Sequence, residues 1–234
     1  MQNVSALYET LFNDEFHCKE HKAVIAGVEY GEDSIVGVPE VTRAMFATDT
    51  PGIGGCVAGA LDLSILPKGN VPKMAEIRMY TRLVGMANGA RQTSEWIPKG
   101  VYYIDTRATD WASGVMTLRA YDAMLKAEQV FLSETTEDDW PKPMDEVVAE
   151  IAARMGVTLD SRTVISSSFL VGWPVEYTMR EVLGHIGVAM AGNWVMTDAG
   201  QLRLVGLTDI PVETSYLVSE DGDVILFGDT RILV

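Results

Sequence analysis

The feature that most constrains the fold of this sequence is a series of short segments in which apolar and polar residues alternate. From Ile77 to Leu83, every second side chain is apolar or is Thr81, so one face of this segment can be buried. Asn88 and Gly89 follow it, a pair that strongly favours a two-residue hairpin turn. The predicted strands are residues 22–30, 35–41, 57–66, 76–84, 95–104 and 115–120. With turns about every ten residues, they predict a small closed or sandwich-like β domain.

Helical patterns replace this alternation in the second half of the chain. Residues 144–155 carry apolar side chains at helical spacing and end at Gly156, which predicts an amphipathic helix. Residues 178–190 predict a second helix, which begins with a capping box of Thr178 and Glu181. The other predicted elements are a short helix within residues 5–12, a helix at 121–129, a hairpin at 193–205 and two strands within 216–234.

A polar, acidic stretch at residues 133–140, followed by Pro141 and Pro143, marks the clearest boundary. We therefore predict an α+β fold, mainly β, in three parts. They are a β-barrel-like domain at residues 1–134, a smaller α+β domain with two helices at 135–207, and strands of a second β domain, short or incomplete, at 208–234.

Charge and composition exclude several classes of function. The 234 residues carry a net charge of −15, whereas nucleic-acid binding needs clustered Lys and Arg against phosphates. Solubility is the simplest role for this charge. Neither a run of about 18 apolar residues nor a secretory signal is present, so no stable membrane insertion is predicted. Two cysteines, Cys18 and Cys56, suit a reducing cytoplasm, and whether they pair stays open.

Among possible metal ligands, His17, Cys18 and His21 lie close together, with Cys56 as a distant fourth. Histidine and cysteine suit zinc, but zinc sites usually have ligand pairs at both ends of the motif. Ordinary surface histidines and a buried cysteine are therefore favoured. In Glu220–Asp223 the acidic residues resemble half of a calcium loop, but the terminal glutamate is missing and a hairpin turn is favoured.

The remaining candidates for chemistry also have simpler interpretations. Gly52–Gly55 invites comparison with a phosphate loop, but no Lys-Ser or Lys-Thr follows, and a bend between strands is favoured. Residues 166–168 lack a nucleophile elbow, and His185 lies within a predicted helix as a packed or partly exposed residue. The carboxylates considered, interpreted as solvated charge because nothing pairs them, are Asp122, Glu128, Glu137, Asp138, Asp139, Asp145 and Glu146. No catalytic, cofactor-binding or metal-binding residue is predicted, and no enzyme.

Three segments resemble the tail hub proteins of phages and prophages of Gram-positive bacteria. The first runs from residue 54 to 66 and on to 83. The second is residues 96–105 (WIPKGVYYID) leading to 118–125 (LRAYDAML). The third combines 178–183 (TMREVL), 191–193 (AGN) and 200–204 (GQLRL).

The resemblance implies a structural protein of the tail tip, related to the central baseplate hub of contractile tails. Such hubs form a trimer with two β-barrel-like tube domains per subunit, which mimics the sixfold tail tube and continues or closes it. The implied partners are further copies of the chain and neighbouring tail proteins: a tube or distal tail protein, the tape measure, and a fibre or spike. Assembly in the host cytoplasm is expected. Because the sequence stops at Val234, no C-terminal enzymatic domain is expected.

Two other classes remain open. One is a different ring-forming tail adaptor, such as a distal tail protein, which hexameric rather than trimeric stoichiometry would indicate. The other is an unrecognised hydrolase, which would need a deep pocket with two facing acids.

Overall fold

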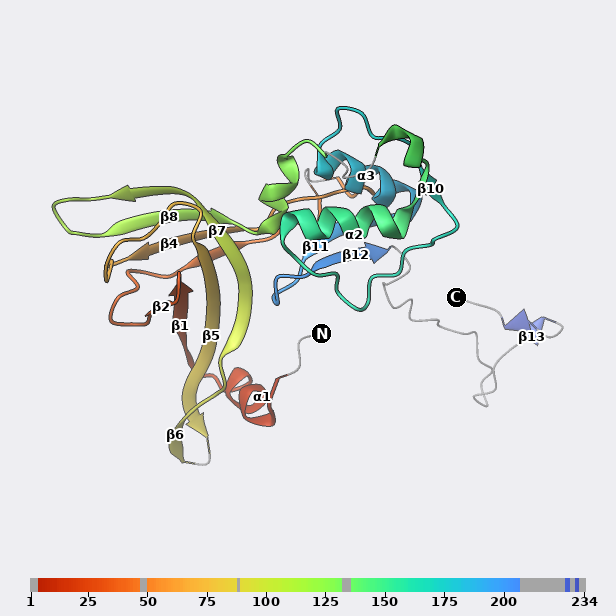
Figure 1. The fold of residues 1–234 in the computed structure, drawn as a ribbon. Helices are drawn as coiled ribbons and strands as arrows, with labels where there is room; N and C mark the ends of the chain where they lie inside the picture. Colours follow the sequence, from red (N-terminus) through yellow and green to blue (C-terminus); the bar gives the residue numbers. More distant parts are fainter. Residues whose placement is uncertain are drawn as a thin grey trace.

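The computed structural model describes residues 4–46, 50–87, 89–131 and 136–206, together with two short strands at 226–227 and 230–231. A large antiparallel sheet lies beside a smaller unit of helices and a two-stranded sheet (Figure 1). Each part is built around its own hydrophobic core. The fold is α+β and mainly β, as the sequence predicts.

The large sheet has eight strands. They are β1 (Cys18–Ile25), β2 (Val28–Tyr30), β3 (Glu40–Thr42), β4 (Ala60–Ile65), β5 (Glu76–Ala87), β6 (Ala90–Thr93), β7 (Ile97–Thr109) and β8 (Met116–Tyr121). Their order is β2-β1-β5-β7-β8-β4-β3, and β6 pairs with β5. Among the described residues no ladder joins the short edge strands β2 and β3. The sheet is therefore open, which corrects the expectation of a closed β domain.

The alternating pattern places the core side chains as expected. Ile77, Met79 and Leu83 on β5 are buried, and the first two pack with Leu61 and Leu63 of β4 in the core of the large sheet. This core excludes water from one face of the sheet and supplies most of its stability.

One predicted strand is in fact a hairpin. Residues 22–30 were expected to be one strand, but Ala26 and Gly27 have φ of 48° and 83°, and they turn the chain between β1 and β2. A left-handed turn of this kind is favourable for Gly27 and is not visible in the apolar pattern. The predicted pairing of residues 95–104 with residues 115–120 is confirmed, because β7 pairs with β8.

The N-terminal helix α1 (Ala6–Phe12) packs against β5. Its N-cap is Ser5, whose hydroxyl accepts a hydrogen bond from the Tyr8 N–H at 3.1 Å. Leu11 is buried in a small cluster with Leu83 and Ala87. The predicted short helix is confirmed, and it covers the end of β5 next to the β6 hairpin (Figure 1).

The smaller unit contains the predicted helices and hairpin. Its elements are the 3-10 helices η1 (Ala123–Glu128) and η2 (Glu137–Asp139), strands β9 (Lys142–Pro143), β10 (Leu170–Val171), β11 (Gly192–Met196) and β12 (Leu202–Gly206), and helices α2 (Met144–Met155) and α3 (Met179–Ala189). Strand β9 pairs with β10, and β11 with β12. Beyond these, β13 (Leu226–Phe227) and β14 (Thr230–Arg231) pair with each other. The expected turn at residues 220–223 lies outside the described residues.

Both helices have the predicted ends. Helix α2 stops at Gly156, whose φ is 70°. Helix α3 begins with the predicted capping box: the Thr178 hydroxyl accepts from the Glu181 N–H at 3.1 Å, and the Glu181 carboxylate accepts from the Thr178 N–H at 2.7 Å. Helix α2 packs in the core of the smaller unit, because its apolar face meets η1 and α3.

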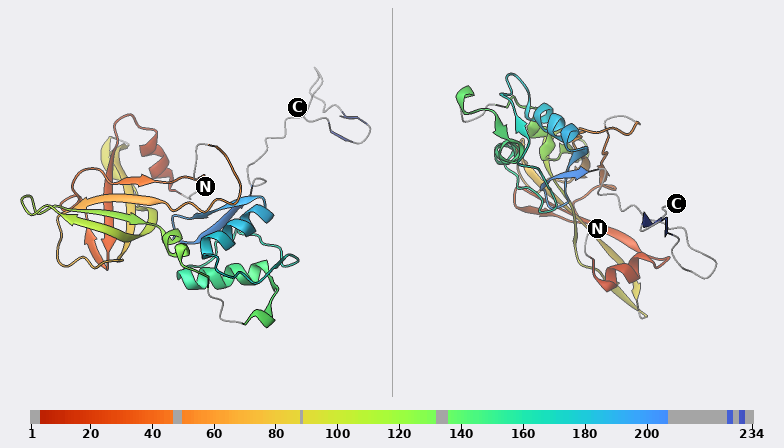
Figure 2. Two further views of the ribbon diagram at one scale, coloured as in Figure 1. Left: turned by 90° about the horizontal axis from the view of Figure 1, so that it is seen from above. Right: turned by 90° about the vertical axis from the view of Figure 1, so that its right-hand side faces the viewer.

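Residues 52–56, which we call the crossing segment, leave the large sheet between β3 and β4 and join the smaller unit (Figure 2). The Gly54 N–H donates to Gly192 O at 2.9 Å, and the Trp194 N–H donates to Gly55 O at 2.8 Å. The Asn193 side chain accepts from the Gly55 N–H at 2.6 Å and donates to Gly52 O at 2.9 Å. The crossing segment thus adds to the edge of β11 and ties the two parts together.

Candidate functional site at the junction of the two cores

Arg43, which follows β3, joins the two parts through an ion pair with Asp198 on the turn between β11 and β12. Its Nη2 also donates to Lys99 O at 2.5 Å and to the Tyr102 hydroxyl at 3.1 Å. Burial raises the pKa of Tyr102, so its phenol stays protonated at neutral pH and donates to Lys99 O at 2.8 Å. At Gly100, whose φ is 130°, an added Cβ would lie 2.7 Å from Arg43 Nη2, so a glycine makes room for this arginine.

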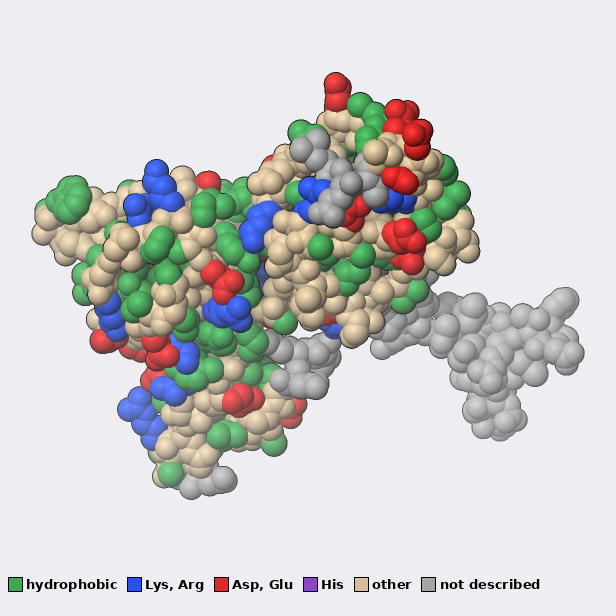
Figure 3. Space-filling view, in the orientation of Figure 1, with side chains coloured by type: hydrophobic (Ala, Val, Ile, Leu, Met, Phe, Trp, Pro, Cys, Tyr) green, Lys and Arg blue, Asp and Glu red, His purple; other side chains and the backbone are tan. Residues whose placement is uncertain are grey.

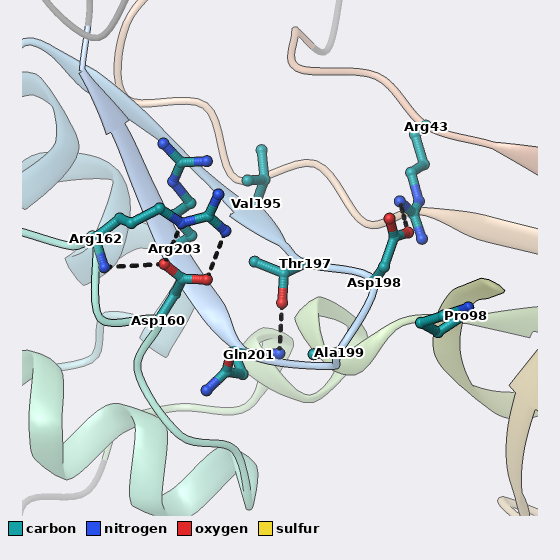
Figure 4. Close-up of a pocket in the computed structure, with 10 residues that line it drawn as sticks. All are labelled: Arg43, Pro98, Asp160, Arg162, Val195, Thr197, Asp198, Ala199, Gln201 and Arg203. Carbon is teal, nitrogen blue, oxygen red and sulfur yellow. Dashed lines mark hydrogen bonds and ion pairs between the residues drawn. The ribbon is translucent and has the colours of Figure 1, made fainter. Parts of the chain in front are cut away.

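A cavity of about 390 Å³ lies beside this ion pair (Figure 4). Its lining residues are Arg43, Pro98, Asp160, Arg162, Val195, Thr197, Asp198, Ala199, Gln201 and Arg203. Most of them come from the β11–β12 hairpin and from the loop after α2, and Arg43 and Pro98 come from the large sheet's part of the chain. The cavity is therefore a shared feature of both parts.

Asp160 and Arg162 form a second ion pair in this cavity. The Asp160 side chain is buried, and its two oxygens accept from Arg162 Nε and Nη2, each at 2.7 Å, and one of them also accepts the Arg162 N–H at 3.0 Å. The hydrogen bonds from Arg162 lower the pKa of Asp160 to about 2, and the positive charge of Arg203 acts in the same direction. A two-pronged arginine–carboxylate contact of this kind fixes geometry as well as charge.

The ion pairs that line the cavity can hold polar segments of the chain in place. The lining residues do not form a catalytic arrangement. Both carboxylates that line it, Asp160 and Asp198, are ion-paired with arginines. No histidine or cysteine lines it, and the Thr197 hydroxyl accepts from the Gln201 N–H at 3.1 Å. A general acid–base pair needs a carboxyl or imidazole that can exchange its proton near neutral pH, and a carboxyl with a pKa of about 2 does not.

Asp122 is the second notable group at the junction. It lies where β8 ends, caps η1, and accepts the Gly59 N–H at 2.7 Å and the Met124 N–H at 3.0 Å. Burial raises its pKa to about 6, against the opposing effect of these two hydrogen bonds. The interpretation of Asp122 as solvated charge is therefore wrong. The sequence carried a usable signal, because an Asp before an apolar helical turn is a common N-cap.

The predicted metal-binding candidates are not brought together. Cys18 is exposed on β1, whereas Cys56 is buried in the core of the smaller unit. Both are free thiols, and burial raises the pKa of Cys56 to about 12, which disfavours the thiolate that zinc binds. His21 accepts or donates a hydrogen bond with the Thr81 hydroxyl at 3.2 Å, and burial lowers its pKa. In the described part of the chain, no group of three or more potential ligands could hold a metal ion.

The other predicted candidates lie apart from one another. Gly52–Gly55 forms a bend, as predicted, within the crossing segment. His185 is exposed on α3, with its ring edge-to-face against Tyr177 at 5.2 Å. Glu128, Glu137, Asp138, Asp139 and Glu146 are exposed, and Asp145 is partly buried. Glu128 forms an ion pair with Arg180 at 3.1 Å, and Asp139 accepts from the Thr136 N–H at 3.0 Å, so these two are not merely solvated. Residues 221 and 223 lie outside the described residues.

Sequence reasoning missed Arg43, Asp198, Asp160 and Arg162. Arg43 and Asp198 are 155 residues apart, and no local pattern joins them. The Asp-Ser-Arg spacing of Asp160 and Arg162 is local, but the hairpin residues that line the cavity with them lie more than 30 positions further along the chain.

No protein-family model matches this chain, and no curated protein matches it either. Solved structures do share its fold. The 43 kDa tail protein of prophage MuSo2 from Shewanella oneidensis aligns with a TM-score of 0.53 and 12% identity over 80% of this chain and 54% of its own. The tail protein from Neisseria meningitidis MC58 aligns with a TM-score of 0.53 and 12% identity over 83% of this chain and 53% of its own.

This likeness shows the fold. The chain spans about half the length of each of these two structures. Among the described residues, no helix has both the length and the apolar character needed to cross a bilayer.

Proposed function

We propose that this protein is a structural component of the tail of a phage or phage-like particle. The observation that carries the proposal is the likeness of fold, over 80% or more of the chain, to two solved proteins that are both tail proteins. The three sequence segments that resemble tail hub proteins support it independently. The arginine-paired carboxylates in the junction cavity also fit a protein whose task is assembly.

Within the tail, we propose the position of a hub that forms a trimeric ring, which continues or closes the tail tube. The open sheet supports this role, because β2 and β3 are exposed edge strands that a neighbouring chain can meet. The net charge of −15 suits a lumen through which DNA passes, since like charges do not adhere. Lysines and arginines lining the lumen of an assembled ring would contradict this last point.

The organisation of the chain is also a proposal. A tube domain at residues 1–134, an α+β domain at 135–207 and the start of a further β domain at 208–234 would place the edge strands β2 and β3 in the tube domain. The proposed partners are further copies of the chain, the tube or distal tail protein, the tape measure, and a fibre or spike.

The test is to find the protein in particles and to count its copies. Tail particles are purified from the phage or bacterium that encodes the chain and labelled with an antibody against it, and the purified protein is weighed by light scattering. We expect label at one end of the tail and a mass three times the 25.6 kDa of the chain. Absence of the protein from intact tails would refute the structural role.

A ring-forming tail adaptor is the second candidate, and a mass of six chains would favour it. The hydrolase alternative needs two facing acids that exchange protons, whereas the two acids of the junction cavity are each paired with an arginine.

A further inference from the structure

The turn between β7 and β8 presents a tryptophan to solvent on a fixed loop. Trp111 is 91% exposed, the highest value among the large hydrophobic side chains of the described residues. The Asp110 side chain accepts from the Ala112 N–H at 2.9 Å and from the Ser113 hydroxyl at 2.6 Å, and the Gly114 N–H donates to Asp110 O at 2.8 Å. The loop is therefore held in one shape, and the indole costs little further entropy when it is bound.

An apolar cavity of about 280 Å³ lies on the smaller unit, between α3 and the loop after β10. Its walls include Trp173, Pro174, Tyr177, His185 and Ile186. A cavity of about 150 Å³ in another protein holds benzene, so this one is large enough for an indole ring. His185, whose ring lines the cavity, supplies a nitrogen that can accept the indole N–H.

The mouth of this cavity is rich in exposed apolar side chains. Leu170 and Tyr177, which line it, are 57% and 44% exposed, and Phe169 and Val175, close to them in the sequence, are 54% and 57% exposed. Exposed apolar side chains gathered in one place, as opposed to scattered singly, indicate a binding surface.

The tryptophan and the cavity lie at opposite ends of the molecule. The β7–β8 turn projects from the far end of the large sheet, and α3 and β10 lie at the other end (Figure 1). One group of hydrophobic side-chain atoms lies at the tip of the turn in the space-filling view (Figure 3). A chain cannot fill its own cavity with this tip, so any contact between the tip and this cavity joins two copies head to tail.

Charge complementarity supports a second copy as the occupant. Arg107 is exposed on β7, four residues before Trp111 in the sequence, and Glu176 is exposed and directly precedes Tyr177, which lines the cavity. Neither side chain has an ion-pair partner among the described residues of its own chain. A head-to-tail contact would let the arginine of one copy approach the glutamate of the next.

We propose that Trp111 of one copy occupies the α3 cavity of the next copy, and that this contact builds the ring. The proposal rests on the ring-forming function above and names the surface that makes the ring. Tryptophan and arginine are the residues most often found to dominate such contacts. A head-to-tail contact closes into a ring when the rotation between copies allows it.

Two variants test the contact from its two sides. Trp111→Ala removes the indole, and Gly172→Phe places a bulky ring at the lining of the cavity, where an added Cβ meets no atom within 4 Å. Sedimentation across a concentration series should show self-association at least about 30-fold weaker for each variant. Phe16→Ala, at another aromatic side chain that is 78% exposed, is the matched control and should associate as the wild type does.

Mixing the variants gives the sharper result. Each variant keeps one half of the contact, so an equal mixture should form heterodimers and nothing larger, whereas the wild type forms rings. A photo-activated cross-linker in place of Trp111 should join two chains at the cavity residues, near Tyr177 or His185. A cross-link to another surface, to the same chain or to a different tail protein would overturn the proposal, as would a wild type that stays monomeric and forms no cross-link at the highest concentration.

Failure of this inference and failure of the proposed function are distinguishable. If Trp111→Ala protein still assembles into tails with the wild-type copy number, the contact is wrong and the tail role stands. If the contact forms in solution but the protein is absent from tails, the contact stands and the tail role is wrong.

Discussion

Gly54, in the crossing segment, is the position where one added methyl group best tests how the two parts are held together. Its φ is 80°, and an added Cβ would lie 2.5 Å from Val188 Cγ2 and 2.8 Å from Gly184 O on α3. Helix α3 has glycines at the same contact: a Cβ at Gly187 would lie 3.2 Å from Gly54 Cα. The two backbones therefore meet without side chains between them.

The cost of Gly54→Ala has two parts. A left-handed conformation costs a residue with a Cβ about 1–2 kcal/mol. Overpacking against α3 adds about 1–3 kcal/mol, because the valine methyl can move but the helix carbonyl cannot. We therefore expect the free energy of unfolding to fall by about 2–5 kcal/mol.

Gly52→Ala is the matched control in the same segment. An added Cβ at Gly52 meets no atom within 4 Å, and its φ lies outside the left-handed range. Its effect should stay within about 0.5 kcal/mol.

The assay is urea unfolding followed by tryptophan fluorescence, supported by amide hydrogen exchange. The midpoint should fall for Gly54→Ala with little change in slope. In the exchange experiment, the Trp194 N–H, which donates to Gly55 O, should lose protection in Gly54→Ala before the amides of β5 do. Equal stability of Gly54→Ala and Gly52→Ala would refute the close approach of the crossing segment to α3.

Three further predictions follow from buried groups. Because its folded pKa is raised to about 6, Asp122 contributes stability below about pH 4 that is lost as the pH rises through 6. The difference in unfolding free energy between the wild type and Asp122→Asn should therefore change by about 2–3 kcal/mol over this pH range in urea titrations, and a difference that does not change with pH would contradict the prediction. Trp194→Ala should cost about 3–5 kcal/mol by the same method, since the side chain is fully buried and donates to Leu183 O at 2.7 Å. In native protein, Cys18 should react with a maleimide while Cys56 stays unmodified until unfolding, as mass spectrometry of the digested chain would show.

The elements that the sequence predicts best are those set by local chemistry. Helices α2 and α3 match prediction at nearly every residue, because a glycine ends the first and a capping box starts the second. Strand β5 is equally clear, since its alternation places Ile77 and Met79 on the buried face.

The features that sequence reasoning misses depend on distant residues. The hairpin of β1 and β2 needs a left-handed Ala26, which no pattern signals. The junction cavity depends on the contact of Arg43 with Asp198, 155 positions away. The burial of Asp122 depends on Gly59, which lies 63 positions before it and donates its N–H to the carboxylate. Composition and residue spacing do not predict such contacts between distant residues.

The crossing segment also has a consequence for synthesis on the ribosome. Gly55 and its partner Asn193 are 138 residues apart, so the glycine-rich edge is made long before the strand that it joins. At about 5–20 residues per second, it waits on the order of 10 s for that strand. Strands β4 to β8 can pair in this interval, but the smaller unit cannot complete its sheet until β11 has left the exit tunnel. The order of translation therefore favours the large sheet as the template on which the smaller unit is finished.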